Sequence, residues 1–134
     1  MLPKLMSMLP SFLAYFAVAI ALVATFLLVY VNVTPYDEIA LIRQGNTAAA
    51  ISLSGALLGF AMPVANVIAH SDTLGDLLAW GAIAGIVQLL TYLAARFTLP
   101  HLAESIPAGK ISEATFLSVL SVTVGLINAA CMTY

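Results

Sequence analysis

The sequence predicts an all-α, polytopic membrane protein with four transmembrane helices. Only ten of the 134 residues carry a formal charge, and they leave four uncharged runs at residues 5–36, 44–71, 77–95 and 114–134. At ~1.5 Å per residue, each run can cross a hydrocarbon core of about 30 Å as a helix. A charged side chain at the centre of the bilayer costs about 2.5–3.5 kcal/mol on insertion scales, so the charges mark the ends of the spans.

The composition supports the same fold class. The chain is 63% hydrophobic and 7% charged, far from the ~25% charged residues of soluble domains. A soluble protein of this size could not hide so much apolar surface from water, whereas lipid removes the problem. The net charge of −2 and the lack of a basic cluster argue against a nucleic-acid partner. A single cysteine, Cys131, excludes an intrachain disulfide and an all-cysteine metal site.

We expect the spans at residues 10–33, 47–69, 75–96 and 112–132, within a single transmembrane domain covering 1–134. The first apolar run continues through Val31, too long for a signal-peptide core of about 7–15 residues, so we interpret it as a retained span. The second and third spans are joined by a tight turn at 70–74. The connections at 34–46 and 97–111 are long, and the order long, short, long is typical of two helical hairpins in series.

The two long connections resemble each other, which predicts an internal repeat. Thr34 and Thr98 stand 64 residues apart, and so do Ile42 and Ile106, and Gly45 and Gly109. Repeat 1 would cover about 10–70 and repeat 2 about 74–134. Since each unit crosses the membrane twice, the two would be parallel repeats related by a pseudo-two-fold axis along the membrane normal.

The first connection has the pattern of a short helix on the membrane surface. Thr34 is the expected N-cap, followed by a proline and by the acidic residues Asp37 and Glu38 at the positive end of the helix dipole. Gly45 would then stop the helix. Capping accounts for both carboxylates without any catalytic chemistry.

Basic residues predict the orientation of the spans. Arg43, Arg96 and Lys110 flank the two long connections, and only Lys4 lies on the other side. By the positive-inside rule the long connections are cytoplasmic, and both termini and the 70–74 turn are periplasmic.

Small and polar residues form stripes on single faces of the spans, at steps of three and four residues. Gly55 and Gly59, like Ala17 and Ala21 in the first span, have the spacing of small residues at helix contacts. The stripes indicate either helix packing or a polar pathway on which Asn66, Asn128 and Gln88 converge. The candidate residues for both interpretations are Ser52, Gly55, Gly59, Pro63, Asn66, Gln88, Ser118, Ser121, Gly125 and Asn128.

The search for catalytic chemistry finds no candidate. His70 and His101 lie on opposite membrane faces in the predicted topology, so they cannot share a metal ion. No metalloprotease, nucleophile-elbow or phosphate-loop motif is present in the sequence. We therefore expect no catalytic residue, no metal, no cofactor and no enzymatic activity. No ionisable residue lies at mid-depth in any predicted span, which argues against a proton-coupled transporter.

Three stretches resemble one known family: Thr34 to Glu38, Gly45 to Phe60, and Gly125 to Met132. They are similar to the YjfL-like family of bacterial inner membrane proteins, whose unit is a pair of transmembrane helices, usually duplicated. The resemblance implies a bacterial inner membrane location and a duplicated four-span architecture. It supplies no catalytic residue.

Two hypotheses for function follow. The first is a structural or accessory membrane protein that forms a homo-oligomer, or docks other membrane proteins, in the lipid bilayer. The second is a small channel or carrier for a small solute or ion, lined by the polar stripes. They differ in whether Asn66, Gln88 and Asn128 face a hydrated cavity or a dry helix contact.

Overall fold

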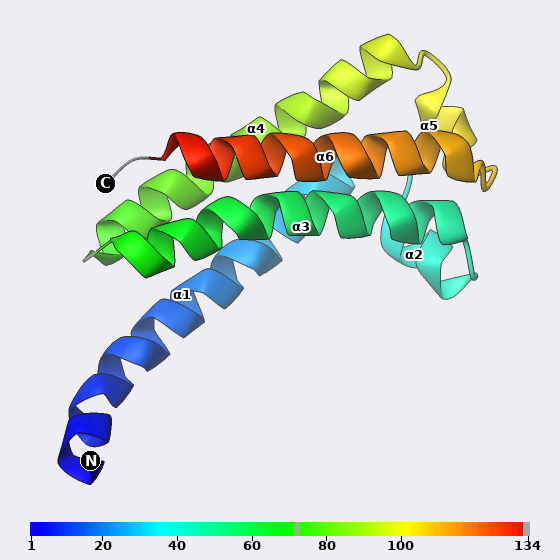
Figure 1. The fold of residues 1–134 in the computed structure, drawn as a ribbon. Helices are drawn as coiled ribbons and strands as arrows, with labels where there is room; N and C mark the ends of the chain where they lie inside the picture. The colour runs from blue at the N-terminus through cyan, green and yellow to red at the C-terminus, as the bar shows by residue number, and fades with distance from the viewer. Residues whose placement is uncertain (72, 133–134) are drawn as a thin grey trace.

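The computed structural model describes residues 1–71 and 73–132, and the regular elements of this part of the chain are all α-helices (Figure 1). In chain order they are α1 (Leu2–Val33), α2 (Glu38–Arg43), α3 (Thr47–His70), α4 (Leu74–Thr98), α5 (Leu102–Ser105) and α6 (Ile111–Cys131). The long helices α1, α3, α4 and α6 are each long and apolar enough to cross a membrane. The prediction of an all-α polytopic protein with four spans is confirmed.

The first helix is longer than the span predicted for it. α1 begins at Leu2 rather than at residue 10, because the backbone N–H of Leu5 already donates to the Met1 carbonyl at 3.0 Å. A proline in the first turn costs no hydrogen bond there. The 32-residue helix is about 48 Å long, which exceeds the ~30 Å hydrocarbon core.

Helices α3 and α6 lie side by side and run in the same direction (Figure 1). Gly55 lies against Ser118 near the start of the contact, and Asn66 donates to the carbonyl of Ala129 near its end. Residue numbers therefore rise together along both helices. The closest pair of helices in the bundle consists of segments from opposite halves of the chain.

Helices α1 and α4 are also parallel, and residues in the C-terminal half of α1 contact α4. Leu22 packs against Gly81, and the rings of Tyr30 and Tyr92 meet edge to face with centroids 5.8 Å apart. The N-terminal half of α1 extends away from the other helices (Figure 1), and Phe12 there is 58% exposed.

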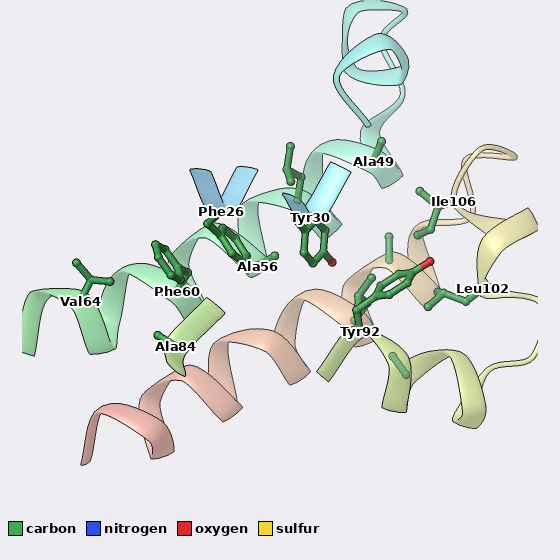
Figure 2. Close-up of a cluster of buried hydrophobic side chains, with 14 of the residues drawn as sticks. Phe26, Tyr30, Ala49, Ala56, Phe60, Val64, Ala84, Tyr92, Leu102 and Ile106 are labelled. Atoms are coloured by element: carbon green, nitrogen blue, oxygen red, sulfur yellow. The ribbon is translucent and has the colours of Figure 1, made fainter. Parts of the chain in front are cut away.

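An aromatic cluster joins α1 to the rest of the bundle (Figure 2). Phe26 of α1 stacks on Phe60 of α3, with ring centroids 4.4 Å apart and an interplanar angle of 3°. Gly85 of α4 lies beside both rings. The side chains of Phe26 and Phe60 are almost fully buried, so this cluster is the centre of the core.

The two long connections lie together at one end of the bundle, and the start of α1 and the end of α6 lie towards the other end (Figure 1). Both connections close with the same turn. Gly45 and Gly109 have φ angles of 85° and 80°, a region that glycine enters without strain. The hydrogen bonds of the two turns match at an offset of 64 residues: Gly45 to Ile42 and Asn46 to Leu41, then Gly109 to Ile106 and Lys110 to Ser105.

The cap of α2 differs from the prediction. Asp37, not Thr34, is the N-cap, and its carboxylate accepts from the backbone N–H of Ala40 at 3.3 Å. Thr34 instead follows the last residue of α1, and its hydroxyl group contacts the Glu38 carboxyl group. Two residues in a bend separate Thr34 from Asp37, which places the threonine too early to cap α2. The predicted stop at Gly45 is where the chain leaves the helix.

Candidate functional site

The small residues predicted on the second and fourth spans form the contact between α3 and α6. A Cβ atom on Gly55 would overlap Ser118, and one on Gly125 would lie 2.7 Å from the carbonyl carbon of Gly59. A Cβ on Gly59 would in turn lie 2.9 Å from the carbonyl carbon of Ser121. Real Cβ atoms do not approach other atoms so closely, so each glycine is required for the two backbones to meet.

Pro63 leaves the carbonyl group of Gly59 without its usual donor within α3. Proline has no N–H group, so it cannot donate to the carbonyl group of Gly59, its normal partner in an α-helix. Gly125 of α6 lies directly against this carbonyl group. Ser52, about two turns earlier on α3, is buried and donates to the carbonyl of Ala49 in its own helix at 3.1 Å.

Gln88 joins α4 to the same contact. Its side chain is 1% exposed, and Nε2 donates to the carbonyl of Ser121 at 3.0 Å. Gly59 makes room for this amide, because a Cβ at that position would meet Gln88 Nε2. The other amide atom, Oε1, is buried and has no hydrogen-bond partner within the described part of the chain.

Asn66 and Asn128 lie at the far end of the α3–α6 contact. Asn66 Nδ2 donates to the carbonyl of Ala129 at 2.9 Å, whereas Asn128 Nδ2 is buried without a hydrogen-bond partner among the described residues. The carbonyls that accept from Gln88 and Asn66 are those of Ser121 and Ala129, about 12 Å apart along α6. Asn66 is therefore at the level of Asn128, and the hydrogen bond of Gln88 lies about 12 Å away along α6.

A buried acidic group forms a second cluster, which the sequence analysis had assigned to capping. Glu38 is 1% exposed, and its Oε1 lies 2.7 Å from the hydroxyl oxygen of Thr34. Removal from water raises the pKa of Glu38 to about 7, the Thr34 hydroxyl opposes this rise, and the nearby charge of Asp37 adds to it.

Three tyrosines from different parts of the chain lie near this acid. Tyr30 is on α1, Tyr36 is in the connection and Tyr92 is on α4, and all three side chains are at least nine-tenths buried. Their hydroxyl groups have no hydrogen-bond partner of good geometry among the described residues, although those of Tyr36 and Tyr92 face each other. Figure 2 shows the hydroxyl groups of Tyr30 and Tyr92 directed towards the end of the bundle that carries Leu102. We refer to Glu38, Thr34, Tyr30, Tyr36 and Tyr92 as the acid–tyrosine cluster.

One sequence signal could have indicated part of this cluster. Tyr30, Thr34 and Glu38 are spaced by four residues, which is the spacing of polar groups on one helix face. Tyr92 joins the cluster from the other half of the chain. Nothing in the sequence around Tyr92 indicates that it lies near Glu38.

Asn46 ties the two long connections together. Its Oδ1 accepts from the N–H of Ala49 at 3.0 Å and so caps α3. Its Nδ2 donates to the carbonyls of Ile106 and Pro107, each at 3.1 Å. One side chain therefore fixes the start of α3 and the position of the second connection.

Within residues 1–71 and 73–132, no group of three histidine, cysteine or acidic residues has the proximity of a metal site. His70 ends α3, and His101 begins α5 at the other end of the bundle. The side chains that the structure brings together are thus small residues, amides, hydroxyls and one acid.

These features define a small polytopic membrane protein whose helices are joined by close small-residue contacts and side-chain amides. The family described as "Domain of Unknown Function (DUF350)" matches residues 4–132, and the chain belongs to this family. It is 37% identical over 124 residues to the UPF0719 inner membrane protein YjfL of Escherichia coli (strain K12), covering 92% of this chain and 94% of the relative.

A second relative comes from a different bacterium. The UPF0719 transmembrane protein YshE of Bacillus subtilis (strain 168) is 31% identical over 88 residues, 66% of each chain. No solved structure matches the chain. The predicted YjfL-like family is confirmed. The four membrane-length helices agree with the names of the two relatives, one an inner membrane protein and the other a transmembrane protein.

Proposed function

We propose that this inner membrane protein self-associates and acts as a structural or accessory component of the bilayer, without a catalytic step. The supporting observation is the state of α1. The small residues of α3 and α6 are occupied by each other within one chain, whereas those of α1 are not. Ala17, Ala21 and Ala24 share one face of α1, and all three are exposed.

The shape of α1 supports the same proposal. Its N-terminal half stands apart from the bundle (Figure 1), and residues on several sides of it are exposed, among them Leu13 and Phe16. Lipid covers such a surface, but helices in lipid also associate where small residues let backbones approach. A second copy of this chain offers the matching face of α1, so a homo-oligomer is the proposed assembly. Other membrane proteins with a small-residue face could dock on the same helix.

Disulfide cross-linking in membranes tests the assembly. After Cys131→Ser, the variant Ala21→Cys should form a cross-linked dimer on oxidation. The control is Leu78→Cys, because Leu78 is 53% exposed and lies close to Gly81, the residue that Leu22 contacts, so its depth is matched. Equal cross-linking at both positions, or none at position 21, would contradict an α1 interface.

The proposed architecture behind this function is a duplicated two-helix unit. The matching turns at Gly45 and Gly109, and the parallel pairing of α1 with α4 and of α3 with α6, support two parallel repeats of about 10–70 and 74–134. Repeat 2 places Leu102 where repeat 1 has Glu38, so the acid–tyrosine cluster would belong to one repeat only.

The second candidate function is a small channel or carrier for a small solute or ion. This function is favoured by two buried amide atoms, Gln88 Oε1 and Asn128 Nδ2, that have no partner among the described residues, since buried polar groups normally bond to protein or water. Thiol labelling in intact membranes distinguishes a channel or carrier from a structural protein. In the Cys131→Ser background, a water-soluble thiol reagent should modify Asn128→Cys and spare Leu58→Cys, at an exposed apolar position of α3, if a wet path exists. An unreactive Cys at 128 would exclude this function.

A further inference from the structure

Glu38 has an environment that capping does not explain. The N-cap of α2 is Asp37, whose carboxylate accepts from Ala40, so Glu38 is free of that role. An exposed position was available on a six-residue surface helix, yet the Glu38 side chain is 1% exposed. Burying an ionised carboxylate is costly unless it is paired, and the group otherwise tends to keep its proton.

No positive charge forms an ion pair with Glu38 in residues 1–71 and 73–132. Within the described part of the chain, the one ion pair of side chains within 4.0 Å joins His101 and Glu104. The charged group that acts on Glu38 is Asp37, which repels it, while Arg96 of α4 acts on Tyr92 instead. Helix α3 packs against α2, and its titratable side chain, His70, is at the opposite end. The remaining titratable neighbours are Tyr30 of α1, Tyr36 of the connection and Tyr92 of α4.

Thr34 can form a hydrogen bond with Glu38 whether the carboxyl group is ionised or protonated. When the carboxyl group is ionised, the threonine hydroxyl donates to Oε1 at 2.7 Å. When the carboxyl group is protonated, its O–H can donate to Thr34 Oγ1. The threonine hydroxyl then donates to the carbonyl of Tyr36, 3.0 Å away. A proton can therefore be gained or lost without leaving either side chain unpaired.

The tyrosine hydroxyls are the second observation that points to this role. Three hydroxyl groups that are buried without a good partner among the described residues lie near the same carboxyl group. Burial raises the pKa of Tyr36, so its hydroxyl keeps its proton and stays a neutral neighbour of the acid. The cluster thus offers a neutral, polar environment, which accepts an uncharged carboxylic acid more easily than a carboxylate.

We propose that Glu38 is a proton-binding site that links the position of α2 to pH. Protonated Glu38 stays inside the acid–tyrosine cluster and holds α2 in place at this end of the bundle. Loss of the proton leaves a charge in a site without a counter-ion, so α2 loosens and the carboxylate moves towards water. The ligand is a proton, and the readout is the position of α2 at the end of the bundle that carries both long connections.

Infrared difference spectroscopy of the whole protein in lipid tests the site. As the pH is raised, a carboxylic acid C=O band should disappear with a midpoint near pH 7, which matches the raised pKa of Glu38. The band should be absent in Glu38→Gln and retained in Glu104→Gln, the matched control, because the Glu104 side chain is 84% exposed. The lack of a band that titrates near pH 7, or such a band that persists in Glu38→Gln, would overturn the proposal.

A second variant keeps the test informative if Glu38→Gln does not fold. Thr34→Val removes the hydroxyl that favours the ionised form, so the midpoint should move to higher pH. Thr98→Val is the control, because Thr98 is the equivalent residue of the second connection and bonds only within α4, to Ala94. An unchanged midpoint in Thr34→Val would argue against the proposed partner.

Discussion

Glycine at position 59 lets three helices meet at one point. Its missing side chain leaves room for the carbonyl of Ser121 and for the amide of Gln88, so α3, α4 and α6 are joined there. The adjacent residue, Leu58, is 59% exposed and faces away from this junction. Two neighbours in the sequence therefore have opposite roles in the fold.

Gly59→Leu should destabilise the bundle much more than Leu58→Ala. A branched side chain at position 59 must push α6 and Gln88 away, and overpacking of this kind costs roughly 1–3 kcal/mol. Leu58→Ala removes an exposed side chain and should change stability by about 0.5 kcal/mol or less. Unfolding by a denaturing detergent measures both. An equal loss of stability in the two variants would contradict the assignment of Gly59 to a contact between helices of one chain.

Glu38 also predicts how stability depends on pH. The unfolded chain ionises Glu38 near 4.5, whereas the folded chain ionises it near 7, so its contribution to stability is complete below pH 4.5. The contribution of Glu38 to the free energy of unfolding, up to ~3 kcal/mol, is lost as the pH rises from about 4.5 through about 7.

The variant Glu38→Gln resembles the protonated acid and should remove this dependence. Melting temperature in lipid nanodiscs between pH 4.5 and 8 is the measurement. A variant whose melting temperature falls with pH as steeply as that of the original protein would show that another group is responsible.

At the scale of elements, Asn46 connects parts that are far apart in the sequence. It caps α3 through Oδ1 and holds the second connection through two bonds from Nδ2. The end of the bundle that carries α2 and α5 therefore depends on one amide. Charge and hydropathy patterns could not predict this, because a capping asparagine looks the same in sequence whether or not its other amide atom has a partner.

Asn46→Ala should loosen both connections together. Loss of the cap and of the two bonds should cost roughly 1–3 kcal/mol. Hydrogen exchange should become faster at the start of α3 and also across residues 102–110. Gln44→Ala is the control, since Gln44 is exposed and its contacts come from the backbone. Faster exchange confined to α3 would show that the bonds to Ile106 and Pro107 contribute little.

At the scale of the whole molecule, the four spans could be predicted because lipid excludes charge, and each run between charges became one long helix. The stripes on the second and fourth spans were likewise visible as a helical period. The helix that each stripe contacts could not be predicted, because the spacing of residues along one helix does not say which other helix its face meets. The burial of Glu38 was missed for a related reason: Tyr92, one wall of its site, comes from the other half of the chain.

The orientation of the molecule is a prediction from its basic residues. Arg43, Arg96 and Lys110 are at the end that carries the long connections, so this end should be cytoplasmic. A reporter fused after Tyr134 should therefore report the periplasm, and a fusion truncated after Thr98 should report the cytoplasm. The opposite result in both fusions would invert the topology.

The parallel contact between α3 and α6 has a consequence for the order of assembly during synthesis. A ribosome completes α3 before α6 exists, so the glycine face and Asn66 enter the membrane without the surface that later covers them. The first two spans cannot finish as a separate hairpin, because the backbone groups that Asn66 and Gly59 contact have not yet been made. The chain can reach its final form only when the last span arrives. A nascent chain that stops before residue 111 presents an uncovered polar face to lipid, which is the kind of surface that membrane chaperones and proteases can recognise.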